Sequence, residues 1–147
     1  MLITNKETSE YIENASIEEK EAFFKALVGL TYADGKIDEE EINSLMKIAS
    51  AYGITNINDF SLYANENKIL EEVKIIANRN LALQLIKELC ILSHTDSNLS
   101  DAETLFIVRV GLAMNIELEK IEQISNWVID HIIWLAQKNI IFEEDNI

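Results

Sequence analysis

The chain has 147 residues, 48% of them hydrophobic, which is enough for one domain with its own core. Twelve Lys and Arg residues stand against 26 Asp and Glu residues, and the formal net charge of -14 repels nucleic-acid phosphates and anionic lipid headgroups. Metal cations and basic protein surfaces are therefore the favoured partners. Proline is absent and only four glycines occur, so helix breakers are rare, and we predict an all-α fold.

A capping box, formed by Ser16 and Glu19, opens the first predicted helix. This helix is predicted to end before Gly35, because glycine can adopt the left-handed conformation that closes a helix C-terminus. A second helix is predicted from Asp38, which is its N-cap, to Gly53. The two helices form a helical hairpin with a short turn.

A connector, residues 55–80, follows the first hairpin and contains six Asn residues, which favour turns and helix caps. Its apolar residues need burial, so it is predicted to be ordered, with short helices at about 59–66 and 69–77. A second hairpin is then predicted from helices at about 81–95 and 101–114.

A last helix is predicted at about 119–138, where apolar residues form one stripe and Trp127 and Trp134 form a second stripe beside it. Because this helix is apolar on more than one face, we predict that it is the central helix of the bundle. The alternative is a subunit contact, with a homodimer formed through Trp127 and Trp134. Residues 139–147 are predicted to be a frayed acidic tail.

Residues 24–54 and 86–116 are two copies of one unit, 62 positions apart and without a gap. The identical pairs are Lys25/Lys87, Leu27/Leu89, Leu30/Leu92, Asp34/Asp96, Glu41/Glu103, Ala51/Ala113 and Ile54/Ile116. The duplication predicts a single-domain helical bundle over residues 1–147, with two hairpins related by an approximate twofold axis, connector helices, a C-terminal helix and an N-terminal segment, residues 1–15.

Two carboxylates recur in both copies, Asp34 with Glu41 and Asp96 with Glu103, and helical periodicity places them on the apolar side of each turn. An ionised carboxylate near a core is costly unless it meets hydrogen-bond donors, a basic group or a metal. One interpretation is structural, because each Glu has the N3 position of a capping box. The other is a divalent cation, and its oxygen ligands would favour calcium, magnesium or manganese.

The pattern YADGKIDEEE near the end of one helix, a following helix that closes at YGI, and a weaker second copy resemble the tellurite-resistance TerB-like family. The resemblance covers about residues 20–116. It implies a duplicated all-helical fold, a bacterial origin and acidic positions proposed to bind divalent metal, here Asp34, Asp38 and Glu41. In the second copy only Asp96 and Glu103 match, because serines replace the glycine and the second aspartate.

The sequence therefore predicts a non-enzymatic TerB-like module that binds a divalent cation at its turns and acts through protein contacts. The resemblance implies a role in tellurite or chemical stress. An acidic adaptor or immunity-type protein, without metal and with a basic partner surface, is the alternative. No triad order, metalloprotease helix or nucleotide loop occurs in the sequence. The N-terminus lacks a signal peptide and no stretch is long enough for membrane insertion, so a cytoplasmic location is expected.

Three other residues carry predictions. Cys90 aligns with Val28 on an apolar face and is predicted to be a buried reduced thiol. His94 is predicted to interact with a helix C-terminus, a ligand role being the alternative. His131 lies between two tryptophans at helical spacing, which indicates an interface or core position and not catalysis.

Overall fold

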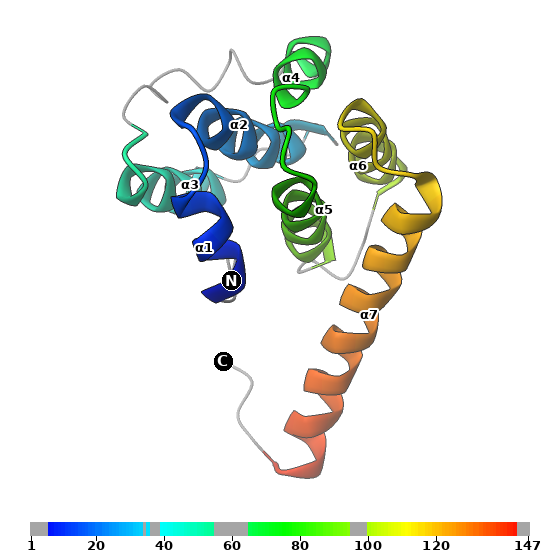
Figure 1. The fold of residues 1–147 in the computed structure, drawn as a ribbon. Coiled ribbons are helices and arrows are strands. Elements are labelled where there is room, and N and C mark those ends of the chain that lie inside the picture. Colours follow the sequence, from blue (N-terminus) through cyan, green and yellow to red (C-terminus); the bar gives the residue numbers. More distant parts are fainter. Residues whose placement is uncertain (1–5, 34, 36–38, 55–64, 95–99, 144–147) are drawn as a thin grey trace.

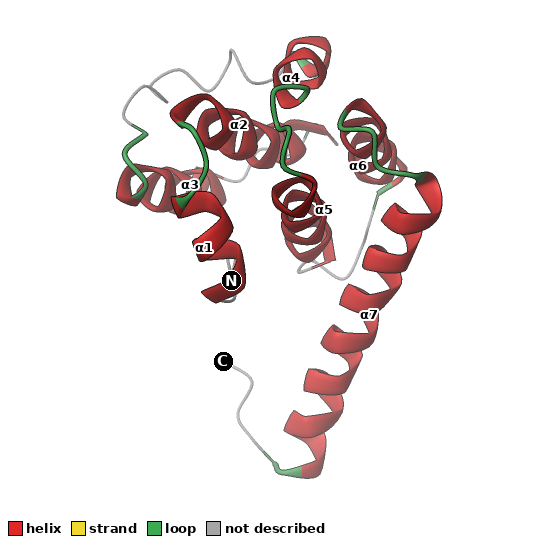
Figure 2. Cartoon of the chain, in the orientation of Figure 1, coloured by secondary structure: helices red, strands yellow, loops and turns green. Residues whose placement is uncertain are grey.

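The computed structural model describes residues 6–33, 35, 39–54, 65–94 and 100–143, and within them the chain forms seven α-helices and no strand (Figures 1 and 2). The helices are α1 (Lys6–Glu13), α2 (Ile17–Ala33), α3 (Glu39–Ala51), α4 (Glu66–Val73), α5 (Arg79–His94), α6 (Asp101–Ala113) and α7 (Leu118–Ile141). The predicted all-α class is confirmed.

The core forms around α2 and α5, which are the first helices of the two copies. α2 packs against α3, α4, α5 and α6, and α5 also packs against α1, α6 and α7. Both helices are buried over most of their length because their apolar residues lie on several faces. The largest fully buried side chains include Phe23, Phe24, Leu27, Leu85, Leu89 and Phe106.

Each copy forms the predicted helical hairpin, α2–α3 and α5–α6, and the two second helices end in the same way. Gly53 and Asn115, 62 positions apart, both have a left-handed backbone, with φ of 84° and 63°. The next residue, Ile54 or Ile116, donates its backbone N–H to the carbonyl oxygen five residues earlier, at 3.1 and 2.9 Å. This is the Schellman closure of a helix C-terminus.

The first turns of α2 and α6 confirm the capping boxes predicted at Glu19 and Glu103. The Glu19 backbone N–H donates to Ser16 Oγ, and the Ser16 N–H donates to Glu19 Oε1, each at 3.1 Å. Ser100 and Glu103 make the equivalent bonds at 3.1 and 3.4 Å. Gly35 lies beyond the end of α2 with φ of 76°, as predicted for a helix-ending glycine.

The connector and the N-terminal segment differ from prediction. The helix predicted at 69–77 is α4, which begins at Glu66 because Asn65 caps it by accepting from the Lys68 N–H at 3.2 Å, and which ends at Val73. Residues 59–64 of the other predicted connector helix lie outside the described residues. Sequence periodicity did not predict α1, which forms because Thr8 and Ile12 are buried against the rest of the bundle.

The prediction that the last helix is central is wrong. The N-terminal part of α7 packs against α5 and α6, and the rest projects away from the bundle (Figure 1). Within α7 only Ile121 and Val128 are fully buried, whereas Trp127 and Trp134 are 56% and 59% exposed. The reason is that α2 and α5 already occupy the centre, so the second apolar stripe of α7 stays mostly exposed.

Candidate functional site

The acidic turn residues are only partly described by the structure. Asp34, Asp38 and Asp96 lie outside the described residues, while Glu41 and Glu103 are half-buried in the first turns of α3 and α6. Glu103 belongs to the Ser100 capping box and also accepts from the Ser100 hydroxyl at 3.1 Å. Within the described part of the chain no three His, Cys, Asp or Glu side chains group as metal ligands. The capping role is thus confirmed for Glu103.

The most prominent surface feature is a set of exposed hydrophobic side chains between residues 127 and 142, on α7 and its C-cap, which we call the α7 apolar face. Seven of the twelve large hydrophobic side chains exposed among the described residues lie here, and their exposed fractions run from 39% to 78%. The members are Trp127, Ile133, Trp134, Leu135, Ile140, Ile141 and Phe142. Exposed apolar residues scattered singly are ordinary, but a concentrated group marks an interaction site.

Three rings stack along this face. The Trp127 and His131 rings have centroids 6.1 Å apart and nearly parallel planes, and His131 and Trp134 repeat the arrangement at 6.3 Å. The stack holds the two indoles in place, so less side-chain freedom would be lost when they are covered. His131 is exposed, so the predicted core position is wrong, and the interface position stays a prediction.

The charged residues on and beside α7 are mainly acidic. The exposed acids from the start of the helix to just past its end are Glu117, Glu119, Glu122, Asp130 and Glu143, against two lysines, Lys120 and Lys138. Glu117 accepts from Arg79 at 2.7 Å, and that hydrogen bond holds the pKa of the Glu117 carboxyl below its usual value. Most of these acids lie near the start of α7, and Asp130, Lys138 and Glu143 are the charged residues within or next to the span of the α7 apolar face.

A buried polar cluster joins α1 to α5, and sequence analysis did not identify it. Glu88 is fully buried, and Lys87 Nζ lies 3.7 Å from its Oε1. Lys87 also donates to Thr8 Oγ1 at 2.6 Å, and the Thr8 hydroxyl lies 2.8 Å from Gln84 Oε1 and 3.2 Å from Glu88 Oε1. One feature of the sequence could have indicated this cluster. Glu88 aligns with Ala26 of the first copy, so a glutamate stands at an apolar position of the helix.

Cys90 is buried between α5 and α7, as the sequence predicted. Burial raises the pKa of its thiol to about 12, although a side-chain hydrogen bond with Ser125 of α7 acts in the opposite direction. At the end of α5, burial lowers the pKa of His94. The predicted interaction of a charged His94 with the C-terminal end of the α5 dipole would raise that pKa. The loss of solvent around the imidazole therefore outweighs the effect of the dipole.

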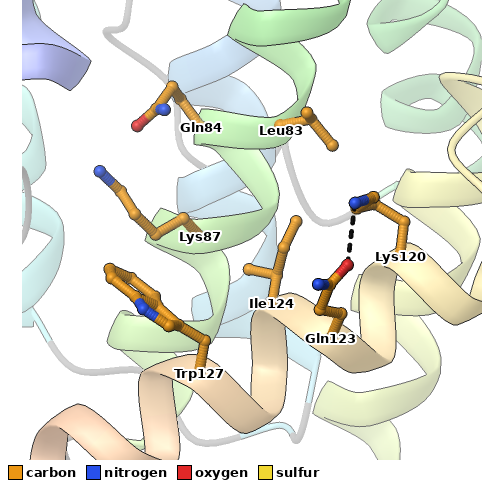
Figure 3. A pocket seen from close by; sticks show the side chains of 7 residues that line it. All are labelled: Leu83, Gln84, Lys87, Lys120, Gln123, Ile124 and Trp127. Atoms are coloured by element: carbon orange, nitrogen blue, oxygen red, sulfur yellow. Dashed lines mark hydrogen bonds between the residues drawn. The ribbon is translucent and has the colours of Figure 1, made fainter.

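A pocket of about 320 Å³ opens between α5 and the first half of α7 (Figure 3). Its lining residues are Leu83, Gln84, Lys87, Lys120, Gln123, Ile124 and Trp127. Trp127 therefore borders both the pocket and the α7 apolar face. This pocket could not be predicted from the sequence, because its residues come from two helices that periodicity alone does not place side by side.

A scan against protein-family models finds no match, and searches of curated proteins and of solved structures find none either. None of the described helices combines the length and the apolar character needed to cross a membrane.

Proposed function

We propose that this chain is a non-enzymatic protein-interaction module, and that it docks through the α7 apolar face into an apolar groove on another protein whose rim is basic. The observation that carries the proposal is the exposure of Trp127 and Trp134 on a helix that projects from the bundle. Tryptophan is enriched among the residues that dominate binding energy at protein interfaces. A helix that is apolar on several faces is normally covered.

The charge pattern favours a basic partner over a second copy or a lipid surface. Two copies of a chain with formal charge -14 repel each other. Helices that lie on membranes usually carry Lys and Arg on their polar face, whereas α7 carries mainly acids. A basic rim would complement the acids beside α7 and speed association.

The test begins with a photo-crosslinking amino acid placed at Trp134, and at exposed Lys47 of α3 as control, in cells that produce the protein. We expect one protein to be crosslinked from position 134 only. Its purified complex should then weaken about 30-fold on Trp134→Ser, equivalent to the loss of about 2 kcal/mol at an interface anchor. Leu105→Ser, at an exposed leucine of α6, should leave the affinity unchanged.

Two results would contradict the proposal. One is a tight homodimer in sedimentation experiments that Trp134→Ser dissociates, which would make a second copy the occupant. The other is a reconstituted complex whose affinity is the same for wild-type protein and Trp134→Ser. Weakening of the complex by added salt would be expected for a basic rim.

Divalent-cation binding at the first hairpin turn, with the TerB-like role in chemical stress, stays a prediction from the sequence. If it is correct, the protein should gain about 2.7 kcal/mol of stability at a hundredfold excess of calcium, magnesium or manganese over the dissociation constant. Glu41→Gln should remove this gain. Glu103→Gln is the matched control in the second copy, because its carboxylate serves the Ser100 cap. Thermal melts with ion and with chelator measure the difference, and no gain at millimolar ion would leave capping as the role of Glu41.

A further inference from the structure

The pocket between α5 and α7 has a chemical character opposite to that of the whole chain. In a protein with 26 acidic and 12 basic residues, its lining contains two lysines, two glutamines and no carboxylate. We propose that this pocket binds a small organic anion, namely a carboxylate attached to a flat apolar body. This site shares Trp127 with the α7 apolar face, but its charged residue Lys120 lies in the first turn of α7 and the docking anchor Trp134 lies in the projecting part.

The α5 side of the pocket presents hydrogen-bond donors held in place by the buried cluster. Lys87 is only 6% exposed, and its ammonium is held by Thr8 Oγ1 at 2.6 Å. The Thr8 hydroxyl lies 2.8 Å from Gln84 Oε1, so the amide nitrogen of Gln84 is the end left to donate elsewhere. A preorganised donor loses little freedom when a ligand arrives.

The α7 side repeats this pairing of a lysine with a glutamine. Lys120 Nζ donates to Gln123 Oε1 at 2.8 Å, which again leaves the amide nitrogen as the remaining donor (Figure 3). An ammonium has three N–H donors, so Lys120 keeps capacity for an oxygen anion. Hydrogen bonds from a charged donor to a carboxylate are about twice as strong as neutral ones.

The neighbouring acids leave positive charge on the lining. Glu88 is fully buried behind Lys87 and offsets that one ammonium, while exposed Glu117 accepts from Arg79 at 2.7 Å and its charge also interacts with Lys120. Lys120 is thus the lysine whose charge a ligand would chiefly meet. Figure 3 shows Lys87 and Lys120 on opposite sides of the pocket, so the ligand carboxylate would pair with Lys120 and Gln123, and no lining carboxylate would be displaced.

The rest of the lining fits a flat apolar group. Leu83 and Ile124 face each other from α5 and α7, and the Trp127 indole borders the same space (Figure 3). The volume of about 320 Å³ lies at the small end of ligand pockets, which usually combine apolar walls with a few polar groups. In an aryl carboxylate of two fused rings, the rings would contact the apolar walls and the carboxylate would contact the polar groups.

The experiment titrates 2-naphthoate into 15N-labelled protein and follows amide and indole N–H shifts, with 2-naphthamide as the neutral isostere. We expect saturable shifts at Lys120, Gln123, Ile124 and the Trp127 indole, and amide binding at least tenfold weaker. Lys120→Gln should weaken 2-naphthoate about tenfold or more, as for loss of a charged hydrogen bond. Lys138→Gln, on the same helix but outside the lining, should bind as wild type.

Three outcomes would overturn the proposal: equal affinities for 2-naphthoate and 2-naphthamide, shifts confined to residues 133–142, or no saturable shift at millimolar ligand. The comparison of the two ligands uses wild-type protein, so it does not depend on how any variant folds. Lys120→Gln should leave the protein-docking affinity unchanged, which separates failure of this proposal from failure of the docking proposal.

Discussion

Replacing Lys87 with methionine is expected to destabilise the protein by about 3–5 kcal/mol, the usual cost of removing one partner of a buried ion pair. Glu88 is fully buried and Lys87 Nζ lies 3.7 Å from its carboxylate, so the variant would leave a buried negative charge without the ammonium that faces it. Methionine retains most of the apolar stem, and the loss should therefore reflect charge and hydrogen bonding more than packing.

The duplication supplies a matched control. Lys25 occupies the same position in the first copy, but its ammonium pairs with Glu72 at 3.1 Å where both side chains are partly exposed. Lys25→Met should therefore cost about 0–1 kcal/mol, the range of surface ion pairs. The double variant Lys87→Met with Glu88→Leu removes both charges and should recover much of the stability lost in the single variant.

Urea unfolding followed by circular dichroism measures all four proteins, with the slope of the transition checked for two-state behaviour. Equal losses for Lys25→Met and Lys87→Met would show that burial does not distinguish the two ion pairs. A double variant less stable than Lys87→Met alone would show that the polar cluster contributes net stability to the contact between α1 and α5.

Cys90 should react with a thiol reagent at pH 8 about a thousandfold more slowly in the folded protein than in urea. Burial raises its pKa from 9.0 to about 12, and the thiolate is the reactive form, so each unit of the shift removes a factor of ten. The same shift means that the neutral thiol favours the folded state below pH 9, and that this stability is lost as the pH rises from about 9 toward 12.

The residual reaction should report detachment of α7, because the Cys90 thiol is hydrogen-bonded to Ser125 of that helix. Val128→Ala loosens the buried side of α7 and should speed labelling at least several-fold, in proportion to the stability lost at this contact. Leu112→Ala, at an exposed leucine of α6, is the control and should label as wild type. Labelling of native protein at the rate of unfolded protein would contradict the buried placement of Cys90.

The helical hairpins could be predicted because their signals are local. The capping boxes at Ser16 and Ser100 and the left-handed residue Gly53 fix helix ends through contacts within a few residues. α1 was not predicted because it lacks such local signals. Its eight residues carry little periodicity of their own, and the helix depends on burial of Thr8 and Ile12 against the rest of the bundle.

The candidate sites could not be predicted in this way. The 62-residue offset makes Lys25 and Lys87 equivalent in sequence, yet one lies partly exposed at α4 and the other is buried beside Glu88. The pocket likewise needs Gln84 and Lys120 from different helices. Neither arrangement has a signature along the chain, because each depends on which helix packs over which face.

The sequence by itself determined the all-α class, the two hairpins and the helix ends, since these follow from periodicity and from hydrogen bonds between residues close in the chain. Only the tertiary structure decided which apolar stripes are covered. α2 and α5 fill the centre, so Trp127 and Trp134 lie more than half exposed on α7. Hydrophobicity requires that a stripe be buried but does not specify its partner, because the hydrophobic effect is not directional.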